Sequence, residues 1–304
     1  MQLEIMLFFQ SIQCSFLTVL ANILSFMAEE TFFILFVLII YWNMDKKKGF
    51  VIFSTLLTAL LSMQVLKAIF RIDRPFVKHP DLIRADRVET ATGYSFPSGH
   101  STGASSFFSL IFSLYKNRIL RTISVILIIL IPLSRLYLGV HWPLDVAVGI
   151  MLGICFTCFV SPLFSKLYDD KQKLKSVSLA IASAGLCISF IFAILLDLAI
   201  LEELQFSDLM KNLAVYSGGF LGLYLEMRMI NFSTEGNIKV KTLRIIAGLL
   251  GALLFMEGLK VLIPSAVYFS GSFIRYSLVG FWATFLFPYL ATKTSLMKKE
   301  ENLQ

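Results

Sequence analysis

The chain has 304 residues, of which 57% are hydrophobic and only 15% are charged, and its mean hydropathy is +0.77. This composition excludes a water-soluble globular protein and predicts an all-α, polytopic integral membrane protein. The net charge of +7 does not indicate a nucleic-acid partner, because the basic residues fall in short clusters between apolar segments.

The apolar segments, taken in chain order, predict a bundle of about nine transmembrane helices, each near the ~20 residues that cross a bilayer. They are 29–43, 50–67, 101–115, 119–138, 143–163, 176–200, 208–230, 243–263 and 272–291. Residues 1–28 are also apolar, but four polar residues interrupt them between positions 10 and 15. This pattern favours an N-terminal interfacial helix over a tenth span.

The basic clusters predict the orientation of the chain. They lie at 46–48, 116–121, 166–175, 228–244 and 293–299. With nine spans, all of these clusters fall on one side, which the positive-inside rule makes cytoplasmic. The polar segment 74–97 then lies outside. We therefore expect a plasma (inner) membrane protein with this segment facing outward, or facing the lumen in an internal membrane.

A charged linker at 165–176 predicts two parts. Residues 1–165 hold nearly all the polar motifs, and residues 166–304 supply additional transmembrane helices whose role the sequence leaves open. In the second part, the glycines at 218, 219 and 222 are typical of close helix packing. Glu257 and Lys260, at i and i+3 within a span, are expected to pair.

The first motif is "KAIFRIDRP", residues 67–75. Its cations Lys67, Arg71 and Arg74 stand at i, i+4 and i+7, which predicts one helical face, with Pro75 ending the helix. Charged side chains at membrane depth are functional candidates. The alternative is that they extend to the lipid headgroups.

The second motif is "PSGH", at the mouth of the next apolar segment. Pro97 is predicted to begin a helix whose first turn is Ser98, Gly99 and His100. A helix N-terminus offers free backbone N–H groups to an anion, and glycine lets the anion approach closely. The alternative is an ordinary helix start without a ligand.

The third motif is "SRLYLGVHWPLD". Ser134 and Arg135 end one predicted span, and His141 precedes the next. Asp145 follows His141 by four residues, so its carboxylate can hold one imidazole nitrogen and leave the other free as a nucleophile or base. The alternative is a buried His–Asp pair that serves packing alone.

Together the three motifs resemble the signature of the type 2 phosphatidic acid phosphatase superfamily. That signature is Lys-x6-Arg-Pro, Pro-Ser-Gly-His and Ser-Arg-x5-His-x3-Asp, and residues 67–145 match every specified position in order. The superfamily includes membrane lipid phosphatases, glucose-6-phosphatase and the vanadium haloperoxidases.

The resemblance implies a phosphate-binding set. Lys67, Arg74 and Arg135 would neutralise the phosphate and the charge on the transferring phosphoryl group. Ser98 and the Gly99 amide would donate hydrogen bonds to it.

The resemblance also implies the catalytic roles. His141 would attack phosphorus and form a phosphohistidine, with Asp145 orienting its ring. His100 would protonate the leaving alcohol and then activate water. No metal and no other cofactor is expected.

The sequence thus predicts an enzyme, a metal-independent membrane phosphatase that hydrolyses a phosphomonoester or diphosphate of a lipid such as phosphatidate, a sphingoid-base phosphate or an isoprenyl diphosphate. The alternatives are hydrolysis of a soluble phosphate in the manner of glucose-6-phosphatase, transfer of phosphate to another lipid, and a lipid-binding or transport protein without catalysis. The expected partners are the membrane and the lipid phosphate. A homo-oligomer stays open.

Overall fold

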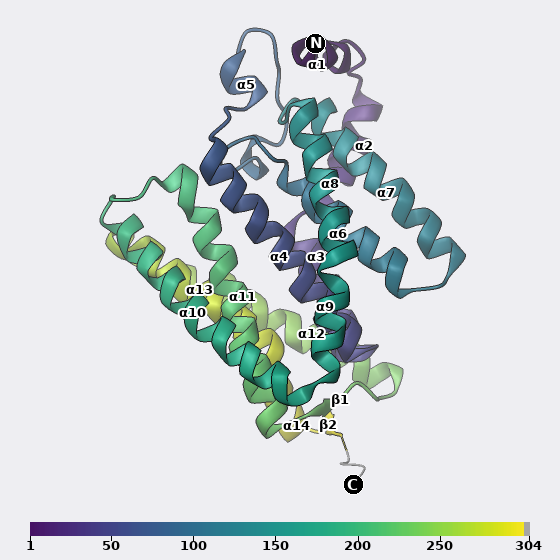
Figure 1. Cartoon of the computed structure of the whole chain (residues 1–304), viewed down its shortest axis with the longest axis vertical. Helices are drawn as coiled ribbons and strands as arrows, with labels where there is room; N and C mark the ends of the chain where they lie inside the picture. Colours follow the sequence, from purple (N-terminus) through teal and green to yellow (C-terminus); the bar gives the residue numbers. More distant parts are fainter. Residues whose placement is uncertain (301–304) are drawn as a thin grey trace. The chain divides into compact units, whose positions relative to one another are not determined.

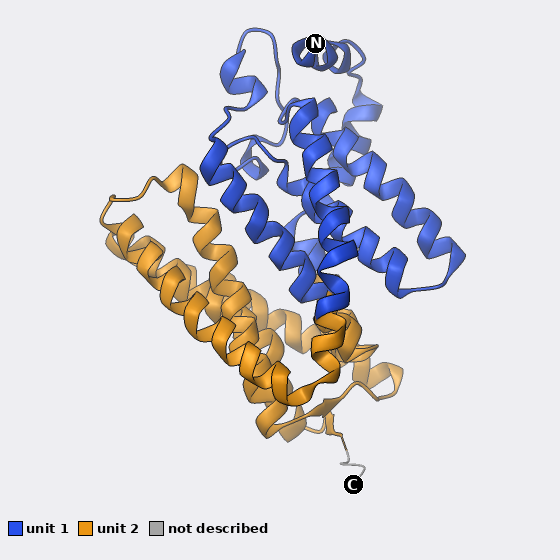
Figure 2. Cartoon of the chain, in the orientation of Figure 1, with its two compact units in different colours: residues 1–34, 52–163 blue, residues 35–51, 164–304 orange. Residues whose placement is uncertain are grey.

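The computed structural model describes residues 1–300, and helices make up most of them (Figure 1). The chain forms two compact units (Figure 2). Unit 1 contains residues 1–34 and 52–163, and unit 2 contains residues 35–51 and the chain from residue 164 onward. The sequence predicted a different kind of division, in which residues 1–165 are the phosphatase core and residues 166–304 are additional helices. That division describes function, so it stays a prediction.

Unit 1 is a helical bundle that carries all three motifs. Its elements are α1 (Gln2–Ser11), α2 (Ser15–Phe26), the start of α3 (Glu30–Asn43), most of α4 (Lys46–Phe70), α5 (Pro75–Lys78), the short 3₁₀ helix η1 (Val88–Thr90), α6 (Gly99–Leu114), α7 (Arg118–Tyr137) and α8 (Pro143–Phe159). Helix α9 (Ser161–Asp169) leads into unit 2.

Close packing of α6 on α8 brings the second and third motifs together. A Cβ atom at Gly149 of α8 would lie 2.8 Å from the Ser98 carbonyl oxygen, and one at Gly153 would lie 2.6 Å from the Thr102 carbonyl oxygen. Only glycine allows the two backbones to approach so closely. In addition, the Ser98 amide donates a hydrogen bond to the Asp145 carbonyl oxygen at 3.0 Å.

The N-terminal segment forms two helices where the sequence favoured one. Helix α1 ends at Ser11 and α2 begins at Ser15, so the break falls among the polar residues noted in the sequence. Helix α2 then meets α3 at a bend of 49°. Figure 1 shows α1 and α5 at the same end of unit 1.

Unit 2 consists of long helices and one short antiparallel ribbon. Its elements are α10 (Lys171–Asp197), α11 (Glu203–Met229), α12 (Ile238–Leu253), the π-helix η2 (Leu254–Gly258), the 3₁₀ helices η3 (Leu259–Leu262) and η4 (Ser265–Val267), α13 (Tyr268–Phe281), the π-helix η5 (Trp282–Leu286), α14 (Phe287–Lys293), and the paired strands β1 (Phe232–Ser233) and β2 (Lys298–Lys299).

Two predictions for unit 2 have different outcomes. The glycines of α11 pack closely as predicted, since Gly218 lies against the Ser277 carbonyl and Gly222 against Thr284. The prediction that Glu257 and Lys260 form an ion pair was wrong, because no such pair forms among residues 1–300. Helix α12 changes there to a π-helix and then a 3₁₀ helix, so the α-helical i, i+3 spacing does not hold.

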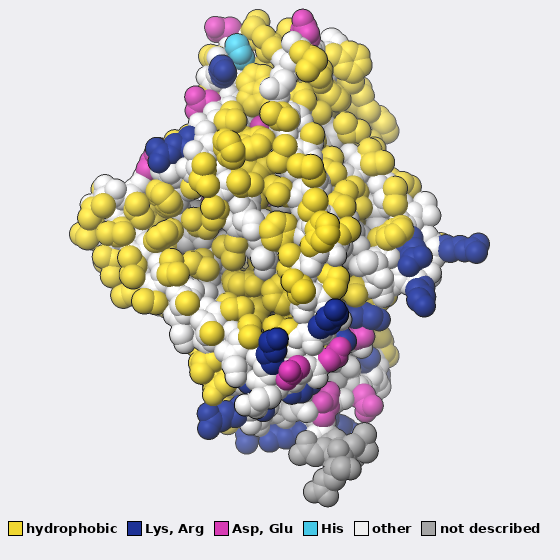
Figure 3. Space-filling model, viewed as in Figure 1, with side chains coloured by type: hydrophobic (Ala, Val, Ile, Leu, Met, Phe, Trp, Pro, Cys, Tyr) yellow, Lys and Arg dark blue, Asp and Glu magenta, His cyan; other side chains and the backbone are white. Residues whose placement is uncertain are grey.

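The fold is that of an all-α integral membrane protein. Within the described part of the chain, six helices are long and apolar enough to cross a membrane: Lys46–Lys78, Arg118–Tyr137, Pro143–Asp169, Lys171–Asp197, Ile238–Leu262 and Ser265–Lys293. The bent pair α2–α3 could add a seventh. Figure 3 shows hydrophobic side chains over much of the visible surface, as expected for helices that face lipid. The predicted count of nine is not confirmed.

Candidate active site

The cations of the first motif do not share one helical face, so that prediction was wrong. Helix α4 ends at Phe70, and Arg71 has a left-handed backbone with φ 48°. Arg74 is extended (φ −72°, ψ 155°), as expected for a residue before proline, and precedes α5. As a result Lys67 and Arg74 are buried and Arg71 is exposed.

Lys67 and Arg74 hold the loop that leads to the second motif. Arg74 donates hydrogen bonds of 2.6–3.5 Å to the backbone carbonyls of residues 92–94. Lys67 Nζ donates to two of the same carbonyls, at 2.7 and 3.4 Å. Arg74 Nη1 also donates to the Val140 carbonyl at 3.0 Å and lies 3.2 Å from His141 Nε2. The first motif therefore contacts the third directly.

A hydrogen-bonded carboxylate lies on the other side of the His141 ring. His141 Nδ1 is 3.4 Å from Asp145 Oδ2, and both side chains are buried. Asp145 Oδ2 also accepts hydrogen bonds from Ser95 Oγ (2.5 Å) and the Trp142 amide (2.8 Å). These donors fix the carboxylate, which in turn orients the ring.

These contacts determine the protonation of His141. A guanidinium can only donate, so Nε2 facing Arg74 is the unprotonated nitrogen, and Nδ1 carries the proton toward Asp145. Burial, followed by the positive charges of Arg74, Lys67 and Arg135, lowers the pKa of His141 well below its ordinary value of 6.5. A neutral ring whose Nε2 carries no proton can act as a nucleophile.

Arg135 and His100 present buried side-chain nitrogen atoms near His141. Arg135 is fully buried, and its Nη1 donates to Ser25 Oγ. Its Nε and Nη2 have no hydrogen-bond partner among the residues that the structure describes, and the same is true of His100 Nε2. Both residues lie close enough to His141 to act on its charge. Unpaired buried donors are unfavourable, and the oxygens of a phosphate would satisfy them.

The second motif forms a helix N-terminus, although α6 begins at Gly99 and not at Pro97. Ser98 is the N-cap, and its Oγ accepts hydrogen bonds from the Ser101 amide (3.4 Å) and Ser101 Oγ (2.9 Å). Gly99 begins the 16-residue helix. This end of α6 is a suitable place for an anion, since its first amides point out of the helix.

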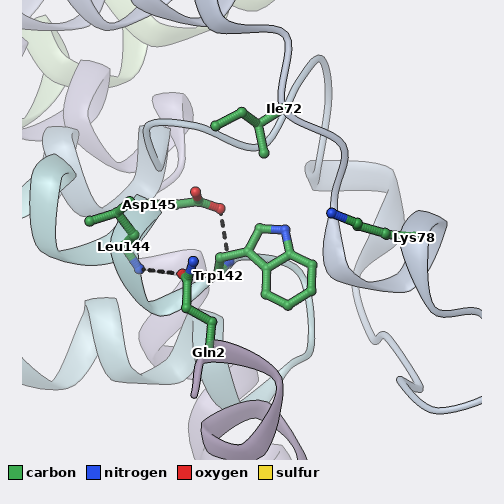
Figure 4. Close-up of a pocket in the computed structure, with 6 residues that line it drawn as sticks. All are labelled: Gln2, Ile72, Lys78, Trp142, Leu144 and Asp145. Carbon is green, nitrogen blue, oxygen red and sulfur yellow. Dashed lines mark hydrogen bonds between the residues drawn. The ribbon is translucent and has the colours of Figure 1, made fainter.

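A pocket of about 240 Å³ adjoins this cluster (Figure 4). Its lining residues come from α1, the α4–α5 region and the start of α8: Gln2, Ile72, Lys78, Trp142, Leu144 and Asp145. Figure 4 shows the Asp145 carboxylate beside Trp142, and Gln2 joined to the Leu144 amide, which donates to Gln2 Oε1 at 3.1 Å. The pocket therefore reaches the Asp145 side of the His–Asp pair.

The structure adds Ser95 and Ser25 to the residues predicted from sequence. Ser95 lies two residues before Pro97, and Ser25 lies in the N-terminal segment; both are fully buried. Their hydroxyls contact Asp145 and Arg135, respectively. A single serine outside the motifs carries no sequence signal for such a contact, so neither could be singled out.

The chain resembles known phosphatases in both halves. Residues 48–169 match the sequence model of the PAP2 superfamily, and residues 210–299 match that of the PAP2 superfamily phosphatase transmembrane extension. A putative undecaprenyl-diphosphatase of Escherichia coli is 30% identical over 146 residues, which are 46% of this chain and 72% of that protein. Mouse sphingosine-1-phosphate phosphatase 1 is 27% identical over 302 residues, 87% of this chain and 69% of that protein.

Among solved structures, that of Aquifex aeolicus LpxE is similar, with a TM-score of 0.45 and 23% identity, over 53% of this chain and 93% of that one. The helical membrane fold and the sequence matches define an integral membrane phosphatase, a phosphoric-ester hydrolase. The chain belongs to the PAP2 superfamily, as its three motifs predicted.

Proposed function

We propose that this phosphatase hydrolyses a phosphomonoester or diphosphate of a lipid through a phosphohistidine on His141. The observation that carries the proposal is the arrangement around that ring. Its Nε2 faces Arg74 at 3.2 Å, and its Nδ1 faces Asp145. A neutral, oriented imidazole beside a buried cation is suited to attack an anionic phosphorus centre.

The phosphate-binding group consists of Lys67, Arg74, Arg135, Ser98 and the Gly99 amide. The unpaired Nε and Nη2 of Arg135 supply two donors that, within residues 1–300, bond to nothing else. Lys67 and Arg74 add charge and hold the surrounding loops. These groups stabilise the negative charge on the equatorial oxygens during transfer.

The reaction proceeds in two steps. In the first, His141 Nε2 forms a bond to phosphorus while the bond to the leaving oxygen breaks, and His100 donates a proton to that oxygen. Asp145 stabilises the positive charge that develops on the His141 ring. In the second, His100 accepts a proton from water, whose oxygen attacks phosphorus and releases phosphate and free His141. Neither step uses a metal.

Relatives support a lipid substrate and suggest which head group to test first. Two relatives carry the names undecaprenyl-diphosphatase and sphingosine-1-phosphate phosphatase 1. The alignment with the second covers both halves of this chain. A sphingoid-base phosphate and an isoprenyl diphosphate are therefore the first candidates, and phosphatidate is the third.

For topology we propose nine spans with the active site on the outer side of the plasma membrane, or on the lumenal side of an internal membrane. Six of these spans are the apolar helices named above, and the other three are α3, α6 and α11. Helices α3 and α6 have only 14 and 16 residues, and α11 carries several charged side chains. Each is thus a weaker span by length or composition alone.

A substrate panel tests the proposal. Detergent-purified protein is given sphingosine phosphate, an isoprenyl diphosphate, short-chain phosphatidate and a sugar phosphate, with His141→Ala as the control for contaminating phosphatases. We expect phosphate release from at least one lipid, unaffected by EDTA and inhibited by vanadate. Hydrolysis of the sugar phosphate alone, appearance of the phosphate on a second lipid, or activity that needs added magnesium would contradict the proposal.

A further inference from the structure

Polar side chains of the N-terminal segment contact the elements that carry the motifs. This segment, residues 1–29, precedes the part of the chain that matches the PAP2 model, which begins at residue 48. Some of its polar residues, such as Thr18 and Ser25, lie at half-buried or buried positions inside unit 1, whereas large apolar side chains such as Phe16, Val19 and Ile23 are exposed. Two of the polar residues that interrupt this apolar segment, Gln10 and Gln13, thus have partners in other elements of unit 1.

The end of α7 is held by three residues of the segment. The Cys14 amide donates to the Tyr137 hydroxyl at 3.0 Å, and Thr18 Oγ1 lies 3.0 Å from the same hydroxyl. Gln13 Nε2 donates to the Tyr137 carbonyl at 3.0 Å. Tyr137 follows Arg135 by two residues, so these contacts fix the helix end that presents Arg135.

The loop between α5 and α6 is held in the same way. Gln10 exchanges two hydrogen bonds with the backbone of Arg84, at 3.0 and 3.1 Å. Arg87, which has a left-handed backbone with φ 57°, forms an ion pair with Glu29 and donates to the Asn22 carbonyl at 3.1 Å. This loop leads to residues 92–94, the carbonyls that Lys67 and Arg74 bind.

Ser25 makes the most direct contact. It is fully buried in α2, and its Oγ accepts the hydrogen bond from Arg135 Nη1. With Nη1 engaged in this way, Nε and Nη2 are the Arg135 donors that remain unpaired within the described residues. When one nitrogen of a planar guanidinium is held by a hydrogen bond, the orientation of its other N–H groups is fixed as well.

We propose that Ser25 is a positioning residue, which holds the Arg135 guanidinium so that its two remaining donors bind the phosphoryl group. The N-terminal helices α1 and α2 are then part of the catalytic unit and not only a membrane attachment. This inference rests on the proposed function, since it gives Arg135 a phosphate-binding role.

The test compares Ser25→Ala with Ser15→Ala, a matched control at an exposed position of the same helix. Loss of a hydrogen bond to a charged group, about 1.5–3 kcal/mol, corresponds to a roughly 10- to 100-fold fall in kcat/KM. The same factor is expected in the affinity for vanadate, measured by the rise in Tm that vanadate causes. Ser15→Ala should change neither quantity.

A double-mutant cycle shows whether Ser25 acts through Arg135. In an Arg135→Lys background the guanidinium is absent, so adding Ser25→Ala should cost less than about twofold. Additive losses would overturn the inference, as would equal behaviour of Ser25→Ala and Ser15→Ala. If Ser25→Ala does not fold, Ser25→Cys preserves the shape while offering only a weak acceptor, and the same outcomes apply.

The vanadate measurement separates this inference from the proposed function. If the wild-type protein binds vanadate but hydrolyses no lipid of the panel, the proposed function fails while the role of Ser25 is still decided by the shift in Tm. If the wild-type protein hydrolyses lipid phosphate and Ser25→Ala leaves vanadate affinity unchanged, the inference fails and the proposed function stands.

Discussion

Arg74 Nη1 lies 3.2 Å from His141 Nε2, and the same nitrogen of Arg74 donates to the Val140 carbonyl immediately before that histidine. The two residues are 67 positions apart in the chain. One guanidinium therefore fixes both the backbone before His141 and the protonation of the His141 ring. Substitutions at Arg74 should affect catalysis through geometry as well as through charge.

Arg74→Lys tests this double role. Lysine keeps the positive charge, but a single ammonium group cannot reach residues 92–94, Val140 and His141 together. We expect kcat/KM to fall by about 100-fold or more. Arg71→Lys is the matched control, because Arg71 is exposed, and it should stay within about twofold of wild type. If Arg74→Lys is as active as Arg71→Lys, the positive charge at position 74 is sufficient and the proposed double role of Arg74 is wrong.

The pH profile reports the state of His141. Its lowered pKa keeps the ring neutral at pH 6.5 and somewhat below, and protonation at still lower pH removes the electron pair that attacks phosphorus in the proposed mechanism. We therefore expect the acidic limb of kcat/KM, corrected for substrate ionisation, to lie below pH 6.5. Two substrates with different phosphate pKa values should share this limb. If kcat/KM for both substrates already falls with decreasing pH above pH 6.5, the result would be inconsistent with the buried cationic surroundings of His141.

His100→Ala should depend on the leaving group. A phenolate leaves without protonation, so the variant should lose less activity on p-nitrophenyl phosphate than on an alkyl phosphate. General acid catalysis is typically worth ~10²–10⁴-fold, so the difference between the substrates should be measurable. His141→Ala should lose activity on both. Equal losses for His100→Ala on both substrates would remove it as the general acid.

The proposed orientation can be tested within unit 1 alone. In a background that lacks Cys14, Cys155, Cys158 and Cys187, single cysteines replace Glu89, in the loop before α6, and Lys116, just after α6. Both positions are exposed. An impermeant thiol reagent on intact cells or oriented vesicles should label Glu89→Cys from outside and Lys116→Cys only after permeabilisation. Labelling of both from one side would contradict the topology.

Much of the fold and of the site could be predicted because the relevant signals are local. Apolar runs predicted the helices, since a span must bury its own backbone hydrogen bonds. The spacing of four residues between His141 and Asp145 predicted a contact that the structure forms across the start of α8. Glycines at positions 218 and 222 likewise predicted packing that depends on local side-chain size.

The remaining features depend on contacts between distant residues or on backbone changes. The helical face predicted for Lys67, Arg71 and Arg74 fails because α4 ends at Phe70, and periodicity does not indicate where a helix stops. The pairing of Ser25 with Arg135 spans 110 residues and leaves no local pattern. The π-helix at residues 254–258 changes the register of a helix in which the hydrophobic pattern continues.

The most direct test of the account is to trap the covalent intermediate. Wild-type protein is mixed with a ³²P-labelled lipid phosphate that the panel has identified as a substrate, and the reaction is stopped within one turnover in neutral denaturant. We predict protein-bound ³²P that is acid-labile and maps to the peptide containing His141, and none on His141→Ala at equal protein amount. Trapped phosphate on His141→Ala, or hydrolysis by wild type in which the label maps to another residue, would contradict the proposed mechanism.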